Sequence, residues 1–371
     1  MASQLRLRQL TSIDEIRGAA PAWDRLWERS DVSLPTVRAE TAALWLEHFA
    51  PRSTVRVLIV QRDGEAVALL PLAGRRQRRL LPVADLPANV WASNGELLLD
   101  PSVDPEPVLD LLAGGLAELP WPLVWLDRVP VEADRWQAFL AAVVRRGMAV
   151  DVRVRYRIGQ VELQDGFAPY VAGRSKNLRR QLRKDSQRLA AEGPVRLTTC
   201  WQLAPEEVEP RLRQAFLIER GSWKHEQGTA VLDAPGLFEF YLRQARQMAA
   251  WGCLRLAFLQ HGGEPIAFEL GWTAKGVYHS FKVGYRQQYG RYSPGHLLRR
   301  ELIRALCEQP GHALVDFQGP MSDALAQWAT RSYALGRLVV AAGGRGSRAL
   351  LGACRVGAHL IRRLRGLGVG G

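Results

Sequence analysis

The order of apolar and polar positions between Leu254 and Gly319 predicts a small mixed sheet with one helix. Two apolar runs, at 254–260 and 265–272, flank a polar turn with two glycines, which is typical of a β-hairpin. Residues 277–285 alternate apolar and polar side chains and include aromatic and β-branched types, so they predict a third strand. Two glycines and a proline in the next residues predict a loop.

A helix is expected directly after this loop. Ser293 suits the N-cap, and Pro294 suits the first helical position, where a missing N–H costs nothing. Apolar residues then recur at helical spacing: Leu297, Leu298, Leu302, Ile303 and Leu306. Gln309 and the following Pro-Gly pair end the helix, and residues 313–319 predict one more short strand.

The expected helix start is a candidate anion site. Backbone N–H groups around Gly295 and His296, together with the positive end of the helix dipole, could bind a pyrophosphate, and Arg291 adds positive charge. The alternative is a helix start that binds only water. The segment contains no GxGxxG motif, so a dinucleotide-binding βαβ unit is not indicated.

An earlier part of the chain repeats this order of elements. Residues 55–72 resemble residues 254–272 as a hairpin, and a helix and a strand follow after a long intervening stretch. Asp104 and Glu106 stand where the helix begins, and their carboxylates would repel a phosphate. The N-terminal half is therefore interpreted as a degenerate copy that shapes the acceptor side. The alternative is chance similarity between two hairpins.

Several segments together resemble the GNAT superfamily of acyltransferases, in its FemABX-like and CelD/BcsL-like branch. They are Ser293-Pro294-Gly295, the Asp316-Phe317-Gln318-Gly319 turn, the tryptophan-lysine segment at 220–231 and the basic helix at 175–197. The resemblance implies an α+β fold of tandem GNAT-like domains, each a mixed, mostly antiparallel sheet flanked by helices. The expected division is 1–165 for a degenerate domain, 166–340 for the catalytic domain and 341–371 for a basic tail.

The resemblance also implies an activity. The chain is expected to be an N-acyltransferase in which an amine of a small-molecule, peptide or sugar-containing acceptor attacks an acyl-CoA or acyl carrier protein thioester directly. Two other readings stay open: a transferase that takes its acyl group from aminoacyl-tRNA, and a GNAT-like binding module without chemistry. The acceptor, the acyl chain length and the oligomeric state are not indicated.

Site roles follow by position in the resemblance. Glu269 is the favoured base, Asp316 and His279 are further candidates, and Tyr285 or Tyr292 could protonate the leaving thiolate. Each could instead be structural: an ion-paired or capping carboxylate, a core histidine or a packing tyrosine. Donor contacts are expected from Leu270, Gly290, Arg291, Tyr292, Ser293, Gly295, His296 and Leu297, with Glu269 and Leu270 offering an exposed strand backbone. Acceptor contacts are expected from Trp223, Lys224, Glu226, Thr229 and Lys282.

Composition narrows the class of protein. A length of 371 residues exceeds what one core usually supports, so two domains are expected. The sequence has no apolar signal core and no run of about 20 apolar residues, which favours a cytoplasmic protein. The four cysteines are widely spaced, so neither a metal site nor a disulfide framework is expected.

The formal net charge of +13 is concentrated in two places. One is the helix with Arg174, Lys176, Arg179, Arg180, Arg183, Lys184 and Arg188. It could face solvent, an acidic ligand or, less favoured, a nucleic acid such as tRNA. The other is the tail after Arg337, which has no acidic residue and carries an apolar stripe at Leu350, Leu351, Cys354, Ala358 and Ile361. This stripe could lie on an anionic membrane surface or dock on the protein itself.

Overall fold

The chain divides into two compact units. The computed structural model describes residues 4–77, 80–222 and 228–367, with side chains up to Val356. Unit 1 comprises residues 1–32, 36–156 and 334–371, and unit 2 comprises 33–35 and 157–333. Unit 1 is therefore built from segments that precede and follow unit 2 in the chain.

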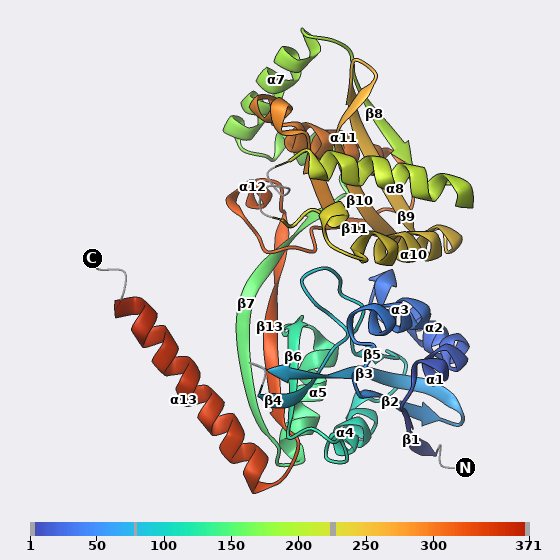
Figure 1. The fold of residues 1–371 in the computed structure, drawn as a ribbon, viewed down its shortest axis with the longest axis vertical. Helices are drawn as coiled ribbons and strands as arrows, with labels where there is room; N and C mark the ends of the chain where they lie inside the picture. Colours follow the sequence, from blue (N-terminus) through green and yellow to red (C-terminus); the bar gives the residue numbers. More distant parts are fainter. Residues whose placement is uncertain (1–3, 78–79, 223–227, 368–371) are drawn as a thin grey trace. The chain divides into compact units, whose positions relative to one another are not determined.

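Unit 1 is a mixed sheet covered by helices (Figure 1). Its strands are β1 (Leu5–Leu10), β2 (Val55–Arg62), β3 (Glu65–Gln77), β4 (Leu81–Asp85), β5 (Leu98–Leu99), β6 (Leu123–Val129), the first half of β7 (Ala149–Glu162) and most of β13 (Arg331–Ala341). Its helices are α1 (Ile13–Gly18), α2 (Ala20–Arg29), α3 (Ala39–Phe49), α4 (Pro105–Leu116), α5 (Asp134–Arg145) and α13 (Arg345–Leu367), and a 3-10 turn, η1 (Pro35–Val37), starts in unit 2. The strand order is β1-β2-β3-β4-β6-β13-β7, with β5 on β3. Only β4 and β6 pair in parallel among the pairs given for this unit.

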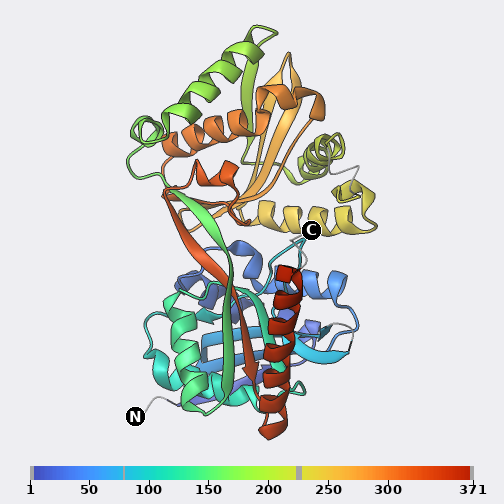
Figure 2. The same ribbon diagram turned by 90° about the vertical axis from the view of Figure 1, so that its left-hand side faces the viewer.

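The core of unit 1 forms because the inward faces of these strands and of α4 and α5 are apolar. Leu58, Leu70 and Leu126 on the strands pack with Leu112 of α4 and Phe139 of α5, and all five are at most 1% exposed. α13 lies alongside this unit (Figure 2), where Leu351 is buried and Leu350 and Cys354 are partly buried. The described part of the apolar stripe thus docks on the protein. No helix of the described residues is long and apolar enough to cross a bilayer.

Unit 2 is a second mixed sheet, between helices. Its strands are the second half of β7, β8 (Val195–Cys200), β9 (Leu254–His261), β10 (Glu264–Ala274), β11 (Val277–Tyr285) and β12 (Leu314–Asp316). Its helices are α6 (Phe167–Ala172), α7 (Lys176–Ala190), α8 (Pro205–Arg220), α10 (Leu237–Ala250), α11 (Pro294–Glu308) and α12 (Asp323–Ala326), with 3-10 turns η2 (Val231–Asp233) and η3 (Gln287–Tyr292). The order is β7-β12-β11-β10-β9-β8, in which β11 and β12 are parallel and the other pairs antiparallel.

The two faces of this sheet bury different side chains. Leu298 and Leu302 of α11 pack on one face with Ala267 and Tyr278. On the other face Phe216 of α8 contacts Phe268, and Tyr241 of α10 contacts Phe281. β10 therefore runs through the centre of the unit, with helices on both sides.

The predicted hairpin, third strand, helix and final strand are all confirmed, and so is the α+β class. One difference concerns the loop before α11. It contains the 3-10 turn η3, and Ser293 holds the N-cap position in a left-handed conformation, with φ 50° and ψ 50°, without a hydrogen bond from its side chain. Ser293 is thus the N-cap by position only.

The repeat is also visible in the fold. In both units a hairpin is followed by a third antiparallel strand, a helix and a strand parallel to the third: β2-β3-β4-α4-β6 in unit 1 and β9-β10-β11-α11-β12 in unit 2. The stretch that the sequence left unassigned in the first copy contains β4. The repeat therefore extends to strand pairing and direction.

Candidate functional site

The parallel strands β11 and β12 pair only briefly and then part. Their pairing runs from Val277 opposite Leu314 to His279 opposite Asp316. β11 continues to Tyr285, and no strand of the described residues pairs with its β12-facing edge beyond His279. Ligands of open α/β sheets bind at the carboxyl ends of parallel strands, and this edge lies at that end. The parting of the two strands makes this edge the candidate place for an extended ligand.

Two local irregularities separate the strands. On β11 the register with β10 shifts, because Leu270 lies opposite Lys282 while Gly271 lies opposite Ser280. Phe281 is left as the extra residue of a β-bulge, which bends the strand. After β12 the chain turns sharply. Gln318 has a φ of 56°, and the backbone N–H of Gly319 donates to the Phe317 carbonyl at 2.6 Å.

A glycine-bearing turn follows β11 at the end away from β12. A Cβ added to Gly290 or to Gly295 would lie 3.9 Å from a ring carbon of Tyr285, which is ordinary van der Waals contact. Both glycines therefore leave room beside this ring for a ligand to approach the backbone. The positive end of α11 points to the same place. The prediction that the His296 backbone N–H is free for an anion is wrong. The N–H groups of His296 and Leu297 donate to the Ser293 carbonyl at 2.9 and 3.2 Å.

At the near end, a hydrogen-bond network joins β11, β12 and β7. The side-chain amide of Gln318 donates to Asp316 Oδ1 at 2.9 Å and lies 3.0 Å from His279 Nδ1. The Gln318 backbone N–H donates to the same carboxylate oxygen, and Gln160 Nε2 donates to the other at 2.8 Å. The side-chain NH2 group of Gln318 donates hydrogen bonds to both His279 Nδ1 and Asp316 Oδ1. His279 Nδ1 must then accept, so the proton of the neutral ring is on Nε2. Burial lowers the pKa of His279, opposed by the Asp316 carboxylate and the Ser33 backbone.

Glu269 is buried in β10, with 2% of its surface exposed. Its Oε2 has no hydrogen-bond partner among the described residues. Tyr278 reaches towards it from β11, because the Tyr278 hydroxyl lies 2.7 Å from the position that a Cβ on Gly271 would take. Burial, followed by the nearby Glu269 carboxylate, raises the pKa of Tyr278 well above its usual value. The Glu269 carboxylate thus lies near the level of the sheet where β11 and β12 part.

One expectation about β10 is wrong. The backbone at Glu269 and Leu270 is not exposed, because β9 pairs with it on one side and β11 on the other. The Leu270 side chain is also fully buried. The strand that lacks a second neighbouring strand, among the described residues and beyond His279, is β11.

Three of the side chains expected to contact the donor bind other residues of the chain. The Tyr292 hydroxyl donates to Glu192, and this bond raises the pKa of Tyr292, while Arg291 lies 3.4 Å from the same carboxylate. His296 accepts a hydrogen bond at 3.0 Å from the indole N–H of Trp328, and burial lowers its pKa. These side chains fix the turn to its surroundings.

The expected acceptor residues are only partly described. Trp223, Lys224 and Glu226 lie outside the described residues, and Thr229 is exposed beside them. Lys282 lies on β11 with its ammonium group 5.1 Å from the centre of the Tyr241 ring. The structure joins His279 and Asp316 through Gln318, whereas Glu269 lies on β10 with its side chain on the other face of the sheet from Trp272, the residue opposite His279. Sequence reasoning missed Gln160 and Gln318. Gln318 belongs to the turn that carries the resemblance, whereas no local signal marks Gln160.

A cationic helix lies beside the glycine turn. α7 buries Leu178, Leu182, Asp185 and Leu189, and it exposes Lys176, Arg179, Arg180, Arg183, Lys184 and Arg188. Its last turn reaches η3, because the Arg188 guanidinium lies 5.5 Å from the centre of the Tyr292 ring. Positive charge therefore extends from the turn along an exposed helix face.

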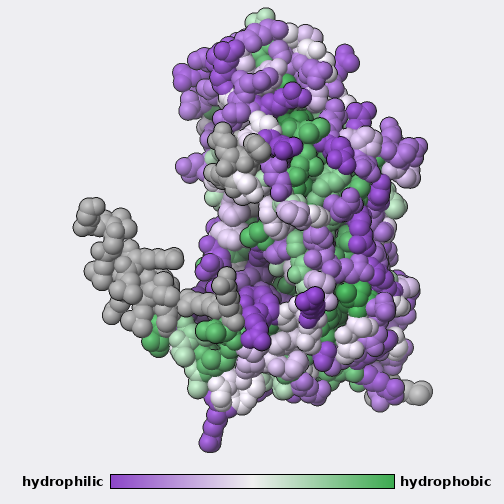
Figure 3. Space-filling model, in the orientation of Figure 1, coloured by the Kyte–Doolittle hydropathy of each residue, from purple (hydrophilic) through white to green (hydrophobic). Residues whose placement is uncertain are grey.

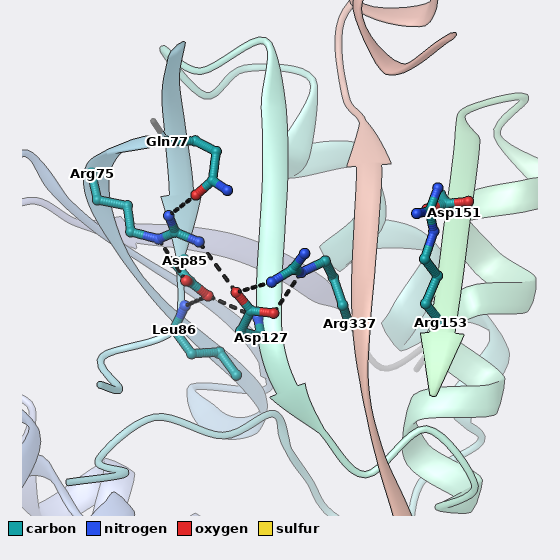
Figure 4. Close-up of polar contacts among 8 residues, drawn as sticks. All are labelled: Arg75, Gln77, Asp85, Leu86, Asp127, Asp151, Arg153 and Arg337. Carbon is teal, nitrogen blue, oxygen red and sulfur yellow. Dashed lines mark hydrogen bonds and ion pairs between the residues drawn. The ribbon is translucent and has the colours of Figure 1, made fainter. Parts of the chain in front are cut away.

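The equivalent place in unit 1 is filled by its own side chains (Figure 4). Asp85, at the end of β4, accepts the backbone N–H of Asp127 on β6 at 3.0 Å. Arg75 pairs with Asp85 at 2.7 Å, and Arg337 pairs with Asp127 at 2.6 Å. At the start of α4, Asp104 accepts the N–H of Glu106 at 3.1 Å. A carboxylate thus occupies the strand edge, and another occupies the helix start.

Part of the sequence is similar to a known protein family, and the fold is similar to solved structures. Residues 176–324 match the family model described as acetyltransferase (GNAT) domain. A search of curated proteins finds no match to the sequence.

Solved structures share the fold over most of the chain. FemX is 11% identical over 90% of this chain and 96% of its own, with a TM-score of 0.59. The C-terminal domain (DUF2156) of a putative lysylphosphatidylglycerol synthetase from Agrobacterium fabrum is 14% identical over 92% and 96%, with a TM-score of 0.56. L-PGS from Bacillus licheniformis is 13% identical over 86% and 90%, with a TM-score of 0.53. Residues 176–324 are thus similar to the acetyltransferase (GNAT) domain, and most of the chain shares its fold with FemX and the other two proteins.

Proposed function

We propose that the chain transfers an acyl group from acyl-CoA to an amine of a small-molecule, peptide or sugar-containing acceptor, by direct attack on the thioester. The observation that carries this proposal is the parting of the parallel strands β11 and β12 beyond His279, on the side of the sheet edge that leads to the glycine turn at α11. A thioester donor, when bound, supplies the activated acyl carbonyl. Groups of the chain bind the donor and accept the proton that the attacking amine loses, and the thiolate leaves as the acyl group is transferred.

The residues at the turn suit the phosphate end of such a donor. Gly290 and Gly295 leave space beside the Tyr285 ring, and the start of α11 attracts negative charge. Strand residues rise about 3.3 Å each, so roughly 16 Å of β11 edge separates this turn from the bulge region. The edge is thus long enough to bind an extended linker and to place the reacting end near His279. We therefore assign Tyr285 to binding of the donor and not to protonation of the leaving thiolate.

Glu269 is the carboxylate we assign as general base. Asp316 accepts three hydrogen bonds from Gln160 and Gln318, which fix its position and occupy both of its oxygens. Glu269 keeps one oxygen without a partner among the described residues. His279 uses its only lone pair on Gln318, so we treat it as a positioning residue.

Unit 1 is assigned the role of a degenerate copy. Its carboxylates at Asp85 and Asp104 lie where a donor would need an open strand edge and an open helix start. Catalysis is therefore assigned to unit 2 alone.

A second candidate donor is aminoacyl-tRNA. The exposed cations of α7 beside the turn favour it, because an extended positive face suits a polyanion. FemX and L-PGS share the fold, and that likeness extends to the fold only. Acyl transfer from aminoacyl-tRNA with strong salt dependence, and none from acyl-CoA, would replace the first candidate.

The deciding experiment is calorimetric titration with acetyl-CoA and a long-chain acyl-CoA. Gly295 has ordinary backbone angles and open space around its Cβ position, so its variants should fold. Gly295→Ala should bind within about threefold of the unmodified protein, whereas Gly295→Glu should lose binding through charge repulsion at the helix start. Equal binding by both variants would remove the phosphate assignment.

A further inference from the structure

A cavity of about 340 Å³ lies in unit 1, between the sheet and α13, apart from the site in unit 2. Its lining comes from β3, β4, β6, β7 and β13 on one side and from α13 on the other. The residues that carry the argument are Trp125, Arg153, Arg337, Val339, Leu351 and Arg355. Nothing in the acyl-transfer proposal uses this cavity.

One end of the cavity is apolar. Trp125, Val339 and Leu351 belong to one hydrophobic cluster, and the cavity also contacts Leu81 and Cys354. α13 is held here at its first turns, where Arg348 donates to the Gly147 carbonyl at 2.7 Å. Hydrophobic and hydrophilic residues lie side by side where the helix meets unit 1 (Figure 3). The helix is thus fixed over the sheet without filling the space beneath it.

The other end is cationic. Asp151 pairs with two guanidinium groups, Arg153 at 2.6 Å and Arg355 at 3.3 Å. Arg337 shares Asp127 with a further arginine (Figure 4). Asp151 therefore leaves one positive charge for an anion to neutralise, whereas Arg75 and Arg337 are balanced by Asp85 and Asp127.

One buried donor lies between the two ends, on Trp125, whose ring centre is 4.9 Å from the Arg337 guanidinium. The indole N–H of Trp125 has no hydrogen-bond partner among the described residues, and Trp125 is 9% exposed. A buried donor without a partner is destabilising, and a bound oxygen would remove that cost.

We propose that this cavity binds a small amphiphile with one anionic head, a carboxylate or a phosphate, and an unbranched hydrocarbon tail. The head would face Arg153, Arg337 and Arg355, and the tail would pack between Trp125, Val339 and Leu351. A volume of 340 Å³ corresponds to about a dozen heavy atoms when each takes roughly the volume of a water molecule in the liquid, ~30 Å³. Medium-chain acids such as octanoate are of this size.

Calorimetric titration of the full chain tests the proposal, with octanoate, octyl phosphate and octanol as probes. Octanoate or octyl phosphate should bind at least tenfold more tightly than octanol, and the tighter anion identifies the head. Ala353→Trp should abolish binding, because Ala353 is exposed on α13 and lines the cavity. Val356→Trp, on the same helix outside the lining, should bind normally.

Two further variants separate the possible failures. Arg355→Gln leaves the Arg153–Asp151 pair intact and should weaken binding of the anions about tenfold without changing octanol. Gly295→Glu, in unit 2, should bind octanoate normally even if it loses acyl-CoA. No heat from either anion, equal binding of octanol, or unchanged binding to a folded Ala353→Trp variant would overturn the proposal.

Discussion

His279 Nδ1 and Gln318 Nε2 are 3.0 Å apart, at the point where the parallel strands β11 and β12 separate. Gln318 can bridge His279 and Asp316 because its backbone takes a positive φ of 56°, an unusual conformation for a residue with a side chain. Strained backbone of this kind is common where a side chain has to be aimed at a functional site.

Substitution of Gln318 should separate its two contributions. Gln318→Ala and Gln318→Gly both lose the amide bridge, but only the glycine variant also relieves the positive φ. We expect Gln318→Ala to lower the free energy of unfolding by about 2 kcal/mol and Gln318→Gly to lower it by about 1 kcal/mol less. Urea unfolding of both variants measures this. Equal values would show that the turn is unstrained.

The lowered pKa of His279 makes stability depend on pH. In the unfolded chain this ring takes a proton below about pH 6.5, whereas in the folded protein it resists protonation. The unfolded state then binds more protons, so stability should fall as the pH drops below about 6.5. His279→Gln should show a smaller loss between pH 7 and 5 in urea unfolding. Parallel curves for the two proteins would contradict this assignment.

Asp85 should make stability change with pH in the opposite direction to His279. Burial raises its pKa to about 6, despite the Arg75 guanidinium and the N–H of Asp127. The folded state therefore holds the proton between about pH 4 and 6, and the contribution of this group to stability falls as the pH rises through that range. The limit of the effect is about 3 kcal/mol.

Asp85→Asn isolates this term, because asparagine keeps an oxygen for the two backbone N–H groups that Asp85 accepts. The difference in unfolding free energy between the two proteins should change by 1 kcal/mol or more from pH 4 to 6.5. A constant difference would show that the carboxylate stays charged.

Catalysis should distinguish Glu269 from Asp316. Glu269→Gln should lower kcat about 100-fold at neutral pH, as expected for loss of a general base, with the KM for acyl-CoA little changed. Asp316→Asn should cost only about tenfold, because it disturbs the position of its neighbours. Steady-state rates across pH 5–9 provide the test. If Asp316→Asn were the more damaging and also removed the acidic limb of the profile, the base would be Asp316.

Sequence reasoning recovered what local pattern encodes. The hairpin at 254–272, the start of α11 at Pro294 and its end before Gln309 follow from apolar spacing and turn residues, and the structure has them at those places. Asp104 was expected at the start of the helix in the first copy of the repeat, and it is the N-cap of that helix, α4.

The pairing of strands is not local and was only partly predicted. The exposed backbone was assigned to Glu269 and Leu270 because an apolar strand does not reveal how many neighbours it has, and β10 has two. Gln160 was missed because it reaches Asp316 from a strand 156 positions earlier in the chain. Gln318 lies in the turn that carries the resemblance, but the direction of its side chain depends on a positive φ that the residue type does not predict.

The division of unit 1 into separate segments has a consequence for biosynthesis. β6 acquires its second neighbour only when residues 336–341 have left the ribosome, because β13 supplies that neighbour after the whole of unit 2 has been made. Unit 2 has all of its strands first. A chain that stopped at residue 333 would contain all of unit 2, together with a first unit whose sheet still ends at β6, an apolar strand with a neighbour on one side only. The last segment of the chain closes a structure that the first segment began.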